Sequence, residues 1–141
     1  MSAVNTGKVL VGGLLAGLVY NGFDIATGMV LMGDEFRANA KRLGLDPAAM
    51  ESGASMAVWI AIDFLLGLLV VWTYAAIRPR FGPGPRTAIF AALVPYVAIS
   101  LMMFGMTHGG MITMSIWMKM TAISLISMSV GAILGAWAYH E

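Results

Sequence analysis

Four long apolar stretches set the limits on how this chain can fold. They cover residues 8–33, 55–77, 86–107 and 111–138. Each is at least as long as the roughly 20 residues that an α-helix needs to cross the hydrocarbon core of a bilayer. Only 11% of the 141 residues are charged, against about 25% in soluble domains. The sequence therefore predicts an all-α fold, a single membrane domain over residues 1–141 that forms a four-helix transmembrane bundle.

The segments between these stretches are predicted to be short and mostly polar. The first, residues 34–54, holds seven of the fifteen charged residues, and Phe36, Ala40 and Leu43 recur in it at helical spacing. This pattern predicts a short amphipathic helix over 34–43, and Asp46-Pro47 predicts the start of a second helical turn. The proline- and glycine-rich segment 78–85 predicts a stiff turn, and 107–110 a tight helical hairpin.

Four spans place both termini on one side of the membrane, and the basic residues indicate which side. The terminal side carries four basic residues and the opposite side three: Lys8, Arg78, Arg80 and Arg86 against Arg37, Lys41 and Arg42. The positive-inside rule therefore favours cytoplasmic termini and an extracytoplasmic linker at 34–54. We expect Arg78, Arg80 and Arg86 to contact lipid phosphates or another anion. An aromatic belt is expected at each face, Trp72, Tyr74, Trp137 and Tyr139 at the terminal side and Trp59 with Phe36 at the other.

Three charged residues interrupt the apolar stretches: Asp24, Asp63 and Lys119. Counted from the 34–54 side, each lies roughly 12–14 Å deep at 1.5 Å per residue. Ser100 falls at a similar level, and Asn21 lies one turn further in. Ionisable groups in hydrocarbon are costly and usually face one another or a functional pathway. These five residues are therefore the candidate buried charge cluster.

Two interpretations of this cluster remain open. In the first, Lys119 forms a buried ion pair with Asp63 or Asp24 and fixes the register of the helices. In the second, the surplus carboxyl group exchanges a proton or a small cation with the outer face. A further alternative is that Lys119 reaches outwards or into a partner subunit.

Methionine is abundant, and much of it surrounds one histidine. Seven of the thirteen methionines lie near His108 in the sequence: Met102, Met103, Met106, Met111, Met114, Met118 and Met120. Thioether and imidazole ligands suit copper, so His108, Met106 and Met111 are weak metal candidates. Methionine is more often an adaptable filler between helices. His108 and His140 lie at opposite faces, which excludes bis-histidine haem ligation within one chain. We expect no cofactor.

Motifs for catalysis and for nucleic-acid binding are missing from the sequence. It contains no cysteine, no metalloprotease helix and no phosphate-binding loop, and a net charge of +1 leaves no basic stripe for nucleic acid. We therefore expect a protein that is not an enzyme. Small residues recur on the first and last spans, as in membrane helix interfaces. The expected role is an accessory or structural subunit that contacts the bilayer and other membrane subunits or copies of itself. The alternative is a small proton- or cation-coupled transporter.

Three segments resemble a group of uncharacterised bacterial four-helix membrane proteins: GGLLAGLVYNGFD at 12–24, VWTYAAIRPRFGPGPRTA at 71–88 and GAWAYHE at 135–141. The second is the most specific of the three. The resemblance implies a four-span architecture and, for a bacterial protein, the inner membrane. It implies no activity. The methionine density and Lys119 are not features of that group.

Overall fold

The computed structural model describes residues 4–139, so His140 lies outside the described residues. Its four long helices are each long and apolar enough to cross a membrane, which confirms the predicted four-helix architecture. The bounds of the four are α1 (Thr6–Ala26), α4 (Gly53–Phe81), α5 (Pro85–His108) and α6 (Met114–Ala138). A π-helical turn, η1 (Thr27–Leu31), extends α1 and was not predicted.

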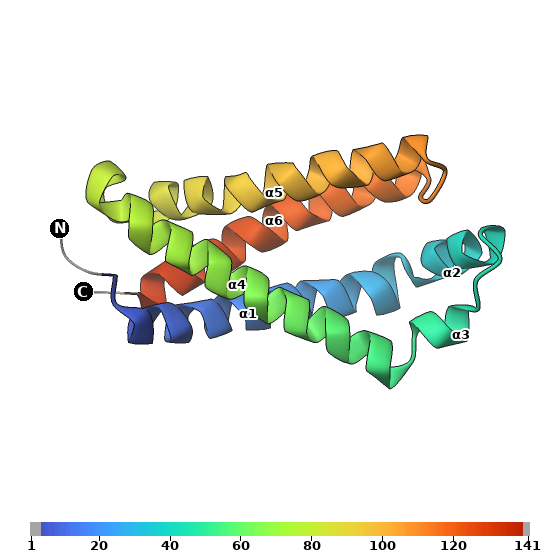
Figure 1. Ribbon diagram of the computed structural model, residues 1–141, viewed down its shortest axis with the longest axis horizontal. Helices are drawn as coiled ribbons and strands as arrows, with labels where there is room; N and C mark the ends of the chain where they lie inside the picture. Colours follow the sequence, from blue (N-terminus) through green and yellow to red (C-terminus); the bar gives the residue numbers. More distant parts are fainter. Residues whose placement is uncertain (1–3, 140–141) are drawn as a thin grey trace.

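Figure 1 shows the helices alternating in direction, so that each end of the bundle gathers a different set of connections. One end, here called the terminal end, holds both termini and the α4–α5 turn. The opposite end, here called the α2 end, holds the linker and the α5–α6 turn. Helix α1 packs against α4 and α6, and α5 packs against α6 and α4. This arrangement follows from four antiparallel spans joined by short connections.

The linker contains the two helical segments expected from its sequence. Helix α2 spans Gly33–Arg42 and α3 spans Pro47–Met50. The Asp46 side chain caps α3 by accepting a 3.0 Å hydrogen bond from the backbone N–H of Ala48. Acidic residues occupy the first turn of α2 and basic residues its last turn, an order that opposes the helix dipole and stabilises the helix.

Helix α4 is longer than its apolar stretch suggests. It continues past residue 77 through Pro79 to Phe81, and the C-cap residue Gly82, with a φ of +82°, ends it. The N–H of Gly82 donates to the carbonyl of Arg78 at 2.8 Å. A proline in the last turn lacks one N–H but does not force the chain out of the helix. The left-handed conformation that stops α4 is available to glycine at little cost.

Glycine lets α1 approach two other helices at backbone distance. A Cβ atom on Gly13 would lie 2.7 Å from the Cα atom of Leu68 on α4, and a Cβ on Gly17 would lie 2.8 Å from that of Phe64. Gly12 meets Gly135 of α6 in the same way. Small residues permit this kind of close helix packing in membranes. The glycine faces of α1 and α6 therefore pack against other helices of the same chain.

The aromatic residues of the terminal end divide into two groups. Trp72 and Trp137 are exposed, as expected for an aromatic belt, but Tyr74 and Tyr139 are buried. The two tyrosine rings pack edge to face with centroids 6.0 Å apart. Their hydroxyl oxygens accept backbone N–H bonds, Tyr139 from Asn5 and Tyr74 from Gly84. The expectation that both tyrosines belong to the belt is wrong, because each hydroxyl accepts a backbone N–H bond inside the bundle, Tyr139 just before α1 and Tyr74 at the α4–α5 turn.

Candidate functional site

Lys119 binds a residue of the linker. Its Nζ donates to Oε2 of Glu35 on α2 at 2.7 Å, and the Ser115 hydroxyl donates to Oε1 of the same carboxylate, also at 2.7 Å. The predicted pairing of Lys119 with Asp63 or Asp24 is therefore wrong. The physical reason is depth, since α6 begins at Met114 and places Lys119 only about 7 Å from that helix end. A lysine side chain can extend from there to the polar end of the bundle.

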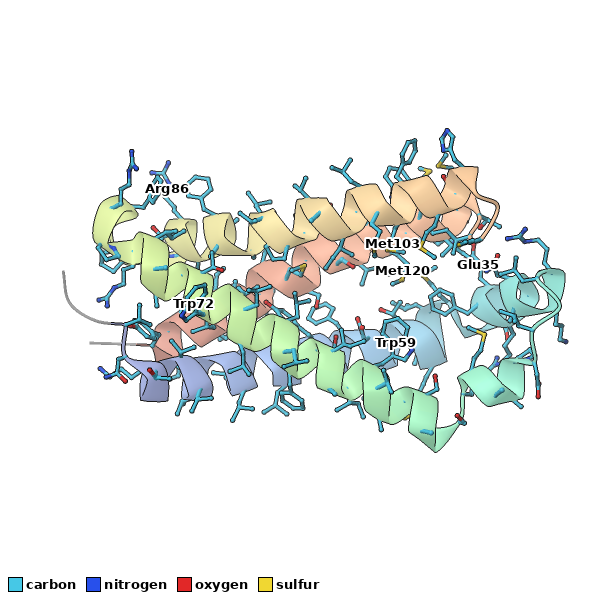
Figure 2. All side chains as sticks on the ribbon, in the orientation of Figure 1. Glu35, Trp59, Trp72, Arg86, Met103 and Met120 are labelled. Carbon is cyan, nitrogen blue, oxygen red and sulfur yellow. The ribbon has the colours of Figure 1, made fainter. Side chains whose placement is uncertain are left out.

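Further polar contacts join α2 to the α5–α6 turn. The Arg42 guanidinium donates to the carbonyl oxygen of Gly110 at 2.7 Å, and the Asn39 amide donates to that of Met111 at 3.0 Å. Together with the Glu35 contacts, these bonds form what we call the α2 clasp. Figure 2 shows Glu35 on the part of α2 nearest the α5–α6 hairpin. A pocket of about 340 Å³ lies beside it, lined by Glu35, Ala38, Asn39, Arg42, Thr113, Ser115 and Ile116.

The clasp has a defined charge state at neutral pH. The hydrogen bond from Lys119, followed by that from Ser115, holds the pKa of Glu35 below its ordinary value. The carboxylate is 27% exposed and the lysine 54% exposed. Each polar side chain of the clasp forms a hydrogen bond within it: Glu35, Asn39, Arg42, Ser115 and Lys119. The clasp is therefore a structural contact between linker and bundle, and no motif in the sequence predicts Glu35 as the partner of Lys119.

Asp63 and Asn21 lie inside the bundle, where α4 crosses α1. Their residues are 6% and 8% exposed. The Asn21 amide nitrogen donates to the carbonyl oxygen of Gly17 on its own helix at 2.9 Å and to that of Ile60 on α4 at 3.4 Å. Asp63 lies one turn along α4 from Ile60. These two residues form the buried polar part of the α1–α4 interface.

The remaining members of the predicted cluster lie elsewhere. Asp24 is exposed on α1, within electrostatic range of Asp63. Ser100 is half-buried on α5, and its backbone carbonyl accepts the indole N–H of Trp117 at 3.0 Å. Lys119 belongs to the α2 clasp. The structure thus brings Asn21 and Asp63 to one interface, leaves Asp24 exposed nearby, and places Lys119 apart from them.

The methionine and histidine candidates lie around the α5–α6 hairpin. His108 is exposed at the end of α5, with its ring centroid 5.0 Å from that of Phe104. Met111 is exposed and Met106 is half-buried. Figure 2 shows Met103 and Met120 directed from the hairpin towards α1. Within residues 4–139, no group of three histidine or acidic side chains gathers as a metal site would require.

The basic residues of the terminal end surround the α4–α5 turn. The Arg78 guanidinium lies 5.9 Å from the ring centroid of Tyr139, and that of Arg80 lies 6.0 Å from the ring of Phe81. Arg86 is exposed beside the turn (Figure 2). Arg78 and Arg80 lie in the last turn of α4 and Arg86 in the first turn of α5, so all three lie at the terminal end of the bundle.

Comparisons of the chain with known protein families, with curated proteins and with solved structures find no match.

Proposed function

We propose that this chain is an accessory or structural subunit that assembles with other membrane-spanning chains or with copies of itself. The observation that carries the proposal is Asp24, which is exposed although it lies within the first span. It lies about 10 Å from the end of that span at Leu31. A carboxyl group exposed to lipid at this depth is unfavourable. A neighbouring protein surface over this part of α1 would remove it from the hydrocarbon.

The packing of α5 supports the same proposal. Its buried residues all lie in its first two turns: Thr87, Ala88, Ala91 and Ala92. From Leu93 to His108 the helix has no fully buried residue. Helix α5 therefore lies at the edge of the bundle and leaves a long apolar surface for lipid or for another chain.

The test uses the absence of cysteine in the sequence, which makes any introduced cysteine unique. Ile25 is exposed beside Asp24, and Leu65 is exposed on α4. We expect Ile25→Cys to form disulfide-linked dimers in the native membrane if copies pair through α1, and Leu65→Cys to be the matched control. Native mass spectrometry after mild detergent extraction reports other subunits. A chain that is strictly monomeric in both experiments and retains no other protein contradicts the proposal.

A second candidate function is proton- or cation-coupled transport through the α1–α4 interface. It is favoured by one observation, the buried Asp63 carboxyl with Asp24 in electrostatic range. Lys119 is not its counter-charge, because that residue binds Glu35. The test is ion or proton flux into liposomes. Unchanged flux after Asp63→Asn would contradict this candidate.

We also propose that the termini face the cytoplasm of a bacterial inner membrane. The terminal end carries Lys8, Arg78, Arg80 and Arg86, which supports this orientation through the positive-inside rule. In this orientation the arginines around the α4–α5 turn would contact anionic lipid phosphates. A reporter fused to the C-terminus that is active only in the periplasm should stay inactive. An active reporter would contradict this orientation.

A further inference from the structure

Asp63 is a buried carboxyl near the middle of a membrane-spanning helix. It lies ten residues after the first residue of α4, Gly53, which corresponds to about 15 Å along the helix. The hydrocarbon core is about 30 Å thick, so this depth is close to the midplane. Only 6% of the residue is exposed. Figure 1 shows that α4 crosses α1 in this central region.

The polar side chains around Asp63 form hydrogen bonds with backbone carbonyls and not with Asp63. The Asn21 amide donates to Gly17 and Ile60, and the Tyr20 hydroxyl is directed at the carbonyl of Met128 on α6 at 3.5 Å. No hydrogen bond or ion pair joins the Asp63 side chain to another residue within 4–139. A buried polar group without a partner is rare in proteins and requires an explanation.

Within residues 4–139, no cation is paired with Asp63. Among the described residues, the charged group within its electrostatic range is Asp24 of α1, which has the same sign. The ionisable residue of α6 is Lys119, which is held by Glu35. Tyr139, the C-cap residue of α6, lies at the terminal end. The ionisable residues of α5 are Arg86, Tyr96 and His108, and the Tyr96 hydroxyl donates to the carbonyl of Thr121.

The close contact between α1 and α4 limits the room for solvent beside Asp63. Gly67, one turn further along α4, touches the backbone of Gly13 and Gly17. Phe64 lies against Gly17. An ionised carboxylate in such surroundings has little contact with water and no counter-ion within residues 4–139, and its charge is strongly unfavourable. Binding a proton removes that charge and leaves the helix contacts unchanged.

We propose that Asp63 is a proton-binding site, whose carboxyl group is uncharged in the folded chain in the membrane. A proton fits better than a metal ion, because a hard cation needs several oxygen ligands and the amide and hydroxyl groups beside Asp63 are directed at backbone carbonyls. The inference does not depend on the proposed function, since an accessory subunit and a carrier can both contain such a site.

The first test is infrared spectroscopy of the full chain in lipid vesicles at neutral pH. A protonated carboxylic acid has a carbonyl stretch above the amide I band, whereas a carboxylate does not. We expect this acid band in the original chain and its loss in Asp63→Asn. Asp24→Asn is the matched control, because it neutralises the exposed neighbour and should leave the Asp63 band in place. Absence of the band from the original chain, or a band of undiminished intensity in folded Asp63→Asn, would overturn the inference.

A second test needs no variant and applies if Asp63→Asn does not fold. A hydrophobic carbodiimide enters the bilayer and reacts with protonated carboxyl groups. The acid proton moves to one carbodiimide nitrogen, and the carboxyl oxygen bonds to the central carbon. The acyl group then leaves that oxygen for the unprotonated nitrogen and gives a stable N-acylurea. We expect peptide mapping to place this adduct on Asp63. An unmodified Asp63 would overturn the inference.

Discussion

The ammonium group of Lys119 and the carboxylate of Glu35 lie 2.7 Å apart and join α6 to the linker helix α2. The same carboxylate accepts the hydroxyl of Ser115, one turn earlier on α6. A lysine within the fourth apolar stretch is thereby paired at the α2 end of the bundle. This contact explains how the span accommodates a cation, and together with the bonds of Asn39 and Arg42 to the α5–α6 turn it fixes the position of the linker.

Loss of the Glu35 charge should loosen α2 and leave the bundle intact. In Glu35→Gln the amide cannot form an ion pair with Lys119, so we expect faster hydrogen–deuterium exchange over residues 33–42. Exchange in the central turns of α1 and α4 should be unchanged. Glu51→Gln is the matched control, because Glu51 pairs with Arg37 inside the linker at 2.7 Å and does not contact α6. Equal exchange in α2 for the original chain and Glu35→Gln would contradict the role of the ion pair.

The clasp should also weaken in acid. Hydrogen bonds from Lys119, and then from Ser115, lower the pKa of Glu35 from its ordinary value of 4.5. A group with a lowered pKa in the folded state stabilises the fold above its ordinary value, and this contribution is lost as the pH falls through the folded value. The Glu35 contacts of the clasp should therefore be complete at neutral pH and weaken as the pH falls below 4.5, while the bonds of Asn39 and Arg42 to backbone carbonyls remain.

The titration of Glu35 can be followed by the carbon-13 shift of its carboxyl group in detergent micelles. Ser115→Ala removes one of the two hydrogen bonds that lower the pKa, so the midpoint should move to higher pH. Thr113→Ala is a control, because the Thr113 hydroxyl oxygen accepts the N–H of Ile116 and does not bond to Glu35. A midpoint at the ordinary glutamate value in the original chain would show that the clasp does not act on Glu35.

The sequence predicted the helices well because length and apolarity decide which segments cross a membrane. It also predicted α2 and α3, since helical spacing and the Asp46-Pro47 start signal are local features. The partner of Lys119 was not predictable from depth alone, because a flexible side chain reaches several residues beyond its own level. The π-turn η1 has no propensity signal of its own. The backbone hydrogen bond from the N–H of Met32 to the carbonyl of Thr27, five residues earlier, identifies it in the structure.

The burial of individual polar residues required the packing of the helices. Asp24 and Asp63 look equivalent in the sequence, yet one is exposed and the other buried. The difference depends on which side of α1 packs against α4. Gly13 and Gly17 determine that side, because they allow the two backbones to approach closely. The tyrosines at 74 and 139 were misplaced for a related reason, because a sequence pattern cannot distinguish a tyrosine facing lipid from one that binds a backbone N–H inside the bundle.

Removal of the Asn21 amide should weaken the α1–α4 interface by a modest amount. Asn21→Ala loses the hydrogen bond to the carbonyl of Ile60, and side-chain hydrogen bonds between membrane helices average about 0.6 kcal/mol and reach about 1.7. Thr73→Ala is the control, because its hydroxyl bonds to Leu69 of the same helix. Reversible unfolding in detergent measures both. An equal loss of stability in the two variants would mean that the contact between helices contributes nothing.

Gly67 should be the least replaceable glycine of the α1–α4 interface. A Cβ atom there would lie 2.6 Å from the backbone nitrogen of Gly17 and also against the carbonyl of Gly13, and neither backbone can move alone. We expect Gly67→Ala to force α1 and α4 apart and to destabilise the fold by about 1–3 kcal/mol. Gly22→Ala on α1 meets nothing within 4 Å and should be neutral or stabilising by up to about 1 kcal/mol through helix propensity. Unfolding in detergent compares the two, and equal stability would contradict backbone contact at this crossing.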